Sequence, residues 1–270
     1  MALTSYERKQ LMEIQKWKKE EPTVISKAFG IILSPVTWLI NKIIPVAAIR
    51  GALDFTSSAA EWLTDTNDIL RDAKVNSISE LKNHNLEVSD ALSNEVHNWA
   101  IGIASVEGGG AGAAGLPGMA FDIPAIIVLA LRTIHKIGVC YGYEVKDKSD
   151  KDFVLAIMAV SGSNDMGEKL AALSTLRSIE VMIAKTTWKK MAEKAATNQM
   201  SKEASVIALK KLAEQLGINL TKRKALQAIP AIGAFVGASV NGWYIKEVGW
   251  AARRSFQERW LIDNQKIIDI

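Results

Sequence analysis

Apolar residues recur every three or four positions along most of the chain, the spacing that places them on one face of a helix. Residues 5–19 form the first such pattern, with Leu11, Ile14 and Trp17 on one face and Pro22 as the stop signal. Further helices are predicted at 53–75, from about 89 into a glycine-rich stretch, and at 123–139, 153–160, 166–188 and 192–217. In the helix from about 89, Trp99 shares one face with Leu92, Val96 and Ile103.

No alternating strand pattern recurs, and strands and helices do not alternate along the chain. The sequence therefore predicts an all-α fold, with residues 1–270 forming a single compact multi-helix domain. The charged turn at 146–152 is the one minor seam that we expect within it. Near the C-terminus, Trp250, Phe256 and Trp260 alternate with charged residues, which indicates an amphipathic helix with an aromatic core face.

Two apolar helical segments are rich in glycine and alanine, at 108–131 and 225–245. Glycine has no Cβ atom, so helices can approach closely where it lies between them. Gly233 and Gly237 have the four-residue spacing typical of such contacts. Asp122 precedes Ile123 and Pro124, a pattern that predicts a structural N-cap with proline in the first turn of the next helix.

The second segment has the length of a membrane span, because residues 225–245 carry no charge. Lys222, Arg223 and Lys224 precede it, and Trp243, Tyr244 and Lys246 lie at its end, which gives a basic flank and an aromatic belt. Its Gly/Ala-rich middle gains little from lipid, however. We therefore expect a buried helix or hairpin that contacts a membrane conditionally, in preference to a permanent span.

Charge is unevenly distributed, although the net charge is only +4. Residues 51–100 carry three basic and nine acidic side chains, whereas residues 185–224 carry ten basic and three acidic ones. A basic block of this kind attracts anionic lipid or remains a solvated helix face. The chain starts without an apolar signal core and has one cysteine, Cys140, so we expect a cytoplasmic protein with a buried thiol.

The stretch from Gly110 to Gly115 formally matches the G-x-G-x-x-G dinucleotide fingerprint. Pro117 and Pro124 interrupt the helix that such a site requires, and no second strand–helix unit follows. The glycine-rich stretch therefore favours a passage between helices, and we expect no cofactor.

The three histidines, His84, His97 and His135, lack the spacing of metal ligands, and we expect His84 and His97 at the surface or in caps. Glu107 and Asp122 bracket the glycine-rich stretch and are the one carboxylate pair that an acid–base reaction could use. We therefore predict no catalytic residue and no metal ligand. A lipid or peptide hydrolase with its site near Glu107 and Asp122 remains an alternative.

Several short motifs follow one another in a fixed order along the chain. They are the Tyr6 helix with Trp17 and Pro22, the Gly/Ala-rich segment into Asp122–Ala125, Tyr141–Tyr143, Phe153–Ala159, Ile229–Ala234 into Gly237–Asn241, and Ala251–Ala252 into Phe256 and Arg259–Leu261. In this order they resemble the EcsC family of bacterial proteins over nearly the whole chain. The resemblance implies an association by name with an ABC-transporter operon and supplies no catalytic residues.

The sequence thus predicts a non-enzymatic helical protein, peripheral at the cytoplasmic membrane. The expected partners are an anionic membrane surface, a transporter or other membrane protein, or a second copy of the chain, and no nucleic acid. A soluble accessory subunit of a transporter is a further alternative. The residues predicted to contact a membrane or partner are Trp38, Lys42, Lys222, Arg223, Lys224, Gly233, Gly237 and Trp243.

Overall fold

The computed structural model describes residues 2–22, 66–113, 115–146, 148–163, 165–192 and 230–267. Every regular element within these ranges is an α-helix, which confirms the predicted all-α fold. The helices are α1 (Ser5–Lys19), α5 (Asn67–Ala73), α6 (Ile78–Leu81), α7 (Leu86–Ala113), α8 (Gly115–Cys140), α9 (Lys148–Gly162), α10 (Met166–Ala192) and α12 (Pro230–Asp263). The bounds of α1 are those that the sequence predicts.

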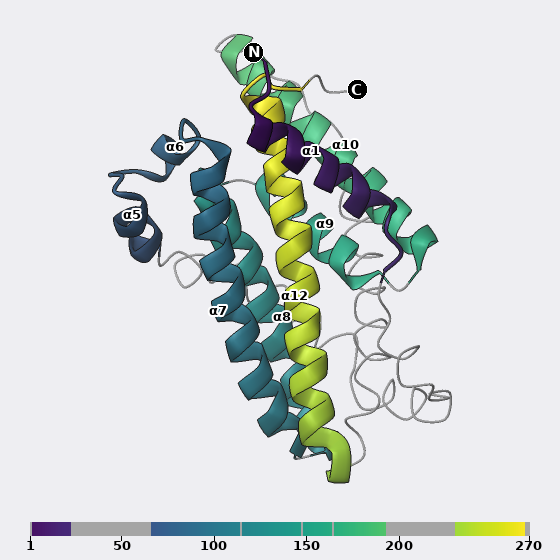
Figure 1. Cartoon of the computed structure of the whole chain (residues 1–270). Coiled ribbons are helices and arrows are strands. Elements are labelled where there is room, and N and C mark those ends of the chain that lie inside the picture. The colour runs from purple at the N-terminus through teal and green to yellow at the C-terminus, as the bar shows by residue number, and fades with distance from the viewer. Residues whose placement is uncertain are drawn as a thin grey trace.

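Three long helices, α7, α8 and α12, lie side by side and form the axis of the molecule (Figure 1). α12 packs along α7 in the opposite direction, because its contacts move backwards along α7 as the chain moves forward. Arg253 donates a hydrogen bond to Asn94 at 3.0 Å, and four residues later Gln257 donates one to Asp90 at 2.7 Å. The α7–α8 hairpin therefore turns where α12 begins, and all three helices share one end.

The face of α7 against α12 is built from small or flat side chains, so the two backbones approach closely. A Cβ atom at Gly249 would overlap the imidazole ring of His97, and one at Gly242 would overlap the hydroxyl of Ser105. These two glycines are seven residues apart, which returns them to the same side of the helix. The close helix approach predicted for the segment at 225–245 is confirmed at Gly242.

Local hydrogen-bonded caps define the start of α1 and the end of α8. Thr4 and Glu7 form a capping box at the start of α1, in which each side chain accepts a hydrogen bond from the other residue's backbone N–H. Two residues after the end of α8, Gly142 has a φ of +84°, the left-handed conformation that glycine adopts without strain. Tyr143 N–H then bonds to the carbonyl of Gly138 at 2.9 Å, which turns the chain sharply.

A second layer covers the half of α12 that lies away from the hairpin tip. α1 crosses α12, α9 packs against it, and α10 packs on α9 (Figure 1). Phe256 is the centre of this region, since its ring stacks on Tyr141 and Tyr143 and meets Phe153 edge-on at 5.3 Å between centroids. Phe256 and Trp260 are both buried, as the aromatic pattern of the C-terminal helix predicted.

The structure corrects the predicted start of α8. The helix begins at Gly115 and runs without a break through Asp122 and Pro124, so Asp122 lies within the helix and not at its N-cap. Pro117 is the third residue of α8, where a backbone N–H has no helical partner to lose. The cost of Pro124 is one missing backbone hydrogen bond, and α8 carries it while packed along α7.

Five of the predicted contact residues, Trp38, Lys42, Lys222, Arg223 and Lys224, lie outside the described residues. Gly233, Gly237 and Trp243 lie in the first half of α12. Within the part of the chain that the structure describes, no helix is long and apolar enough to cross a membrane.

The glycines of α7 and α12 give a matched pair of substitutions. We expect Gly249→Ala to lower the free energy of unfolding by about 1 to 2 kcal/mol, because the new methyl group must displace the buried His97 ring. A methyl group at Gly102, in the interior of α7, would meet no packed neighbour within 4 Å. Gly102→Ala should therefore raise the free energy of unfolding by about 0.5 to 1 kcal/mol. Urea unfolding of both variants tests this, and stabilisation by Gly249→Ala would contradict the close α7–α12 contact.

Candidate functional site

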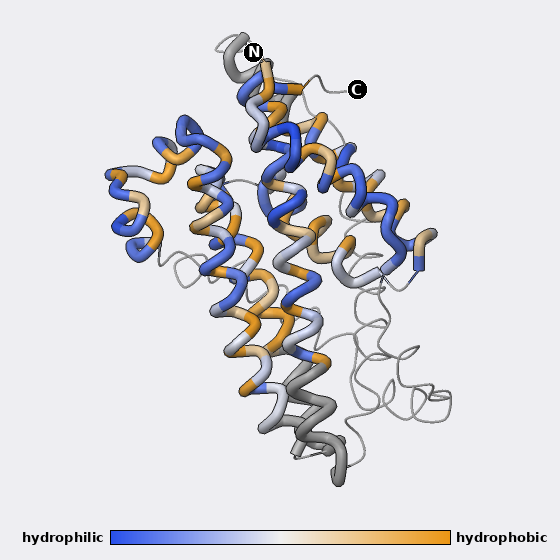
Figure 2. Tube along the Cα trace, viewed as in Figure 1, coloured by the Kyte–Doolittle hydropathy of each residue, from blue (hydrophilic) through white to orange (hydrophobic). Residues whose placement is uncertain are grey.

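The end of the bundle where α7, α8 and α12 meet is poor in charge. Residues 100–131 of the α7–α8 hairpin and residues 230–245 of α12 carry only two charged residues, Glu107 and Asp122. We call these residues the charge-poor end. Figure 2 shows few hydrophilic positions on the coloured part of the hairpin there, whereas α1 is largely hydrophilic. The long bundle thus has one chemically distinct end.

α7 carries an apolar stripe on the side away from α12, which we call the outer stripe. Its members follow one another at intervals of four and three residues, as in a heptad pattern. They are Leu92, Val96, Trp99, Ile103, Val106 and Gly110. Trp99 is 53% exposed and Val106 is 78% exposed. Leu92, Val96 and Ile103 are half-buried and pack against the core, so the stripe exposes apolar surface chiefly at Trp99 and Val106, which makes that part a candidate interaction surface.

Of the predicted apolar face of α7, Leu92, Val96 and Ile103 are half-buried and pack against the core, as predicted, whereas Trp99 is exposed. The fully buried residues of the same stretch of α7 include Ser93, His97, Ala100 and Ala104. They are small or polar, and so the sequence pattern did not distinguish them. Close approach of α12 requires such small residues, because large side chains would hold the two helices apart.

Tryptophan or basic residues lie on each of the three long helices near the border of the charge-poor end, and Trp243 also lines a small cavity beside α1. We call Trp99, Arg132, Trp243 and Lys246 the girdle. The guanidinium carbon of Arg132 lies 5.8 Å from the centroid of the Trp99 ring. Lys246 is exposed, and its carbonyl lies 3.0 Å from the imidazole of His97, which places it at the same level of the bundle as Trp99. Trp243 is one helical turn before Lys246 on α12.

A cavity of about 390 Å³ lies between α5, α7 and α8, next to the girdle. Its lining residues are Asp68, Ile69, Asp72, Leu92, Glu95, Val96, Trp99, Arg132 and Lys136. The buried Lys136 donates to Asp68 at 2.6 Å. Burial alone would raise the pKa of Asp68, but the hydrogen bond and charge of Lys136 outweigh it and hold that pKa below its usual value. The cavity has the size of a ligand pocket and walls of both polarities.

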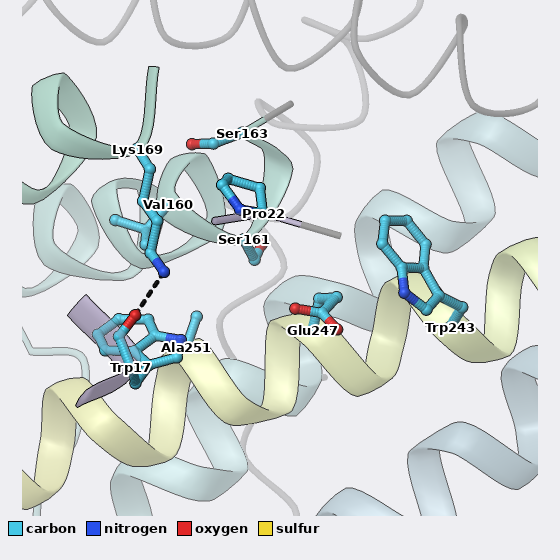
Figure 3. Close-up of a pocket in the computed structure, with 9 residues that line it drawn as sticks. All are labelled: Trp17, Pro22, Val160, Ser161, Ser163, Lys169, Trp243, Glu247 and Ala251. Atoms are coloured by element: carbon cyan, nitrogen blue, oxygen red, sulfur yellow. Dashed lines mark hydrogen bonds between the residues drawn. The ribbon is translucent and has the colours of Figure 1, made fainter. Parts of the chain in front are cut away.

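A second cavity, between α1, α9, α10 and α12, holds about 20 Å³ and is large enough for one water molecule (Figure 3). Lys169 points across it and donates to the carbonyl of Trp17 at 2.5 Å (Figure 3). It also donates to the carbonyl of Glu20 at 2.7 Å. A cation at these carbonyls stabilises the C-terminal end of α1. Burial lowers the pKa of Lys169. The hydrogen bonds of Lys169 across this cavity hold the C-terminal end of α1 in place.

Asp90 is a buried carboxylate to which three side chains from other parts of the bundle donate hydrogen bonds. It is 3% exposed and accepts hydrogen bonds from Tyr6 at 2.7 Å, from Tyr141 at 2.5 Å and from Gln257 at 2.7 Å. Burial and the adjacent Asp90 carboxylate raise the pKa of both phenols, so both remain neutral donors. The carboxylate therefore joins α1, α7, the end of α8 and α12.

Glu180 and Glu258 form a second buried acidic group, where α10 lies near α12. Lys18 of α1 pairs with Glu258 at 2.6 Å, and Arg177 lies 3.4 Å from one oxygen of Glu180. The other oxygen of Glu180 is buried without a hydrogen-bond partner. Burial first, and then the charge of Glu258, raises the pKa of Glu180 to about 7.

The remaining titratable candidates are buried and separate. His97 is buried, contrary to the surface or cap position expected, and burial together with the charge of Arg253 lowers its pKa to about 4. Cys140 is buried as predicted, and burial raises the pKa of its thiol. Among the described residues, no group of three or more histidine, cysteine, aspartate or glutamate side chains could hold a metal ion.

The structure brings together only part of the predicted site. Gly233, Gly237 and Trp243 lie at the charge-poor end or its border, with Glu107 exposed on α7. Asp122 lies on α8 at the same end, and its side chain is outside the described part. Tyr244 of the predicted aromatic belt is buried. The sequence predicted Lys246 as a flank of the 225–245 segment but did not place Arg132 beside the same surface, because their common level depends on the register of three helices. Their one sequence signal is that each is the first lysine or arginine after a long stretch without one.

Comparisons with known proteins agree on one family. The model of the EcsC protein family matches residues 8–261. "Uncharacterized protein YdbA" of Bacillus subtilis (strain 168) is 24% identical, over 95% of this chain and 93% of that protein. "Protein EcsC" of the same organism is 25% identical, over 58% of this chain and 57% of that protein. No solved structure matches.

The Asp90 network predicts a large loss of stability for Asp90→Asn, although the two side chains are almost equal in size. Asp90→Asn replaces one acceptor oxygen by an NH₂ group that faces hydroxyl and amide donors. We expect the free energy of unfolding to fall by roughly 3 kcal/mol. Glu87→Gln, an exposed position on the same helix, should change it by less than about 0.5 kcal/mol. Equal urea midpoints for Asp90→Asn and the parent chain would refute the network's role.

Glu180 predicts a pH-dependent gain in stability. Its pKa in the folded chain is about 7, above the 4.5 of an unperturbed glutamate, so the folded state holds the proton more tightly. The cost of ionising it therefore grows as pH rises from about 4.5 to about 7 and then stays constant. We expect Glu180→Gln to stabilise the chain by about 2 to 3 kcal/mol at pH 8 and by little at pH 5.

Chemical unfolding at pH 5, 6, 7 and 8 measures this difference. Glu95→Gln removes an exposed carboxylate and should show no such dependence on pH. A Glu180→Gln gain that is independent of pH would contradict the raised pKa.

Proposed function

The chain belongs to the EcsC protein family, and on that basis we propose that it is a non-enzymatic protein that inserts its charge-poor end into one leaflet of an anionic membrane. The observation that carries the proposal is the girdle of Trp99, Arg132, Trp243 and Lys246 at the border of that end. Tryptophan and basic residues are enriched where membrane proteins meet the headgroups.

The length of the charge-poor end supports insertion into a single leaflet. From Trp99 to Ala113, α7 extends about 21 Å at 1.5 Å per residue. The hydrocarbon core of a bilayer is about 30 Å thick, so one leaflet contributes about 15 Å. The helices beyond the girdle can thus reach through the headgroups into one leaflet but fall short of the opposite surface. This agrees with the finding that no helix in the described part of the chain has the length and apolar character to cross a membrane.

The energetics support reversible binding. Gly and Ala contribute little apolar area, so the main apolar gain comes from the outer stripe, with Trp99 and Val106 the most exposed members. Arg132 and Lys246 lie where anionic headgroups would be, and each basic residue near such a surface is worth about 1 kcal/mol. The exposed carboxylate of Glu107 opposes insertion.

Liposome flotation tests the proposal with vesicles of phosphatidylcholine, with and without phosphatidylglycerol. We expect the chain to float with anionic vesicles and the double variant Trp99→Asp/Val106→Asp to bind at least about tenfold more weakly, which corresponds to 1.4 kcal/mol. Met12→Asp is the matched control, because Met12 is 61% exposed but lies on α1, away from the charge-poor end.

A substitution that should strengthen membrane binding gives a second test. Glu107→Gln should strengthen binding severalfold, while Glu87→Gln at the other end of the same helix should leave it unchanged. Absence of the parent chain from the floating fraction at every lipid composition would sink the proposal. Equal weakening by Met12→Asp would do the same.

A further inference from the structure

We propose that the cavity between α5, α7 and α8 binds the headgroup of a single aminophospholipid, whose acyl chains lie along the outer stripe of α7. The inference rests on the proposed function, since it assigns a lipid class to the same membrane-facing end. It concerns a different event, however. Insertion uses the whole charge-poor end, whereas this cavity recognises one molecule.

The cavity opens directly onto the outer stripe. Leu92, Val96 and Trp99 belong to both, so the apolar side of the cavity continues without interruption along α7. From Trp99 to Gly110 the stripe extends about 16 Å along the helix axis. This length is close to the thickness of one leaflet, so an acyl chain beside the stripe would keep its normal depth. An amphiphile fits this combination better than a free polar metabolite does.

The charges inside the cavity are mostly satisfied by the chain itself. Lys136 is paired with Asp68 at 2.6 Å, and Asp72 is paired with Arg71 at 3.0 Å. Glu95 is exposed and makes no hydrogen bond or ion pair with any other residue that the structure describes. An unpaired carboxylate at the rim of a ligand-sized cavity favours a cationic group in the ligand.

Arg132 supplies the opposite charge on the facing helix. Its guanidinium lies over the Trp99 ring and carries five N–H donors, so it can keep its contacts within the chain and still donate to a phosphate. Glu95 and Trp99 are four residues apart on α7 and so lie one turn apart on the same face. The cavity is thus lined by an acceptor for a cation, Glu95, and by a donor for a phosphate, Arg132, which lies over the Trp99 ring.

This arrangement selects among phospholipid headgroups. Phosphatidylglycerol has a phosphate but no cation, which leaves Glu95 facing a negative charge. Phosphatidylcholine has a cation that cannot donate a hydrogen bond. Phosphatidylethanolamine has a phosphate and a primary ammonium with N–H donors, and therefore it matches Arg132 and Glu95 together.

Short-chain lipids below their micelle concentration test the site without a membrane. We expect dihexanoyl phosphatidylethanolamine to bind one per chain in isothermal titration calorimetry, at least about fivefold more tightly than the phosphatidylcholine of the same chain length. Free phosphoethanolamine should bind at least about tenfold more weakly than the short-chain lipid, because it lacks the acyl chains. Equal affinity for free phosphoethanolamine would assign the cavity to a soluble phosphate compound and overturn the lipid inference.

Glu95→Gln is the decisive variant, since it removes an unpaired surface charge and leaves the fold intact. It should abolish the preference for the ethanolamine head, and Glu87→Gln should retain it. Retention of the preference by Glu95→Gln, or no binding of any short-chain lipid, would overturn the inference. Flotation of the parent chain with anionic vesicles would then leave the proposed function standing, whereas loss of flotation with retained short-chain binding would reject only the insertion.

Discussion

The buried carboxylate of Asp90 is the interaction on which the arrangement of the helices depends. A charge out of water is costly unless hydrogen bonds replace its hydration, and here two phenols and one amide do so. Those donors come from α1, from the end of α8 and from α12, so the cost is avoided only when all three elements are in place. The carboxylate thereby fixes the register of α12 against α7, and the close contacts of Gly249 and Gly242 follow from it.

That register divides the bundle into two halves with different chemistry. Around Asp90 the helices are tied by directional contacts between side chains, including Arg254 with Gln10 and Lys18 with Glu258. From Gly242 toward the hairpin tip the sequence of α12 is mostly small and apolar, and contacts between such residues carry little directional information. A bundle fixed firmly at one end can present an apolar surface at the other, because its fold does not depend on burying that surface.

The sequence predicts the features that are local. The limits of α1, the all-α fold, the family and the buried thiol of Cys140 all follow from spacing or from ordered motifs. Prediction fails where the answer depends on a second helix. Pro124 has the pattern of a first-turn proline, yet α8 begins at Gly115. Trp99 shares the apolar face of Leu92, Val96 and Ile103 but is exposed. His97 has the pattern of a surface residue but is buried against Gly249 of α12.

The same failure explains why function is hard to read from this chain. Large apolar residues usually mark the core, but in this bundle His97 and Ser105 of α7 meet the glycines of α12, and Trp99 and Val106 remain exposed. α7 thus has two packed faces, one against the glycines of α12 and a second, with Leu92, Val96 and Ile103, that is only half-buried. The second face has the spacing of a packing surface, and the charges beside it, Glu95 and Arg132, have the signs of a zwitterionic ligand. The surface that resembled a core in the sequence is thus the part of the bundle best suited to bind something else.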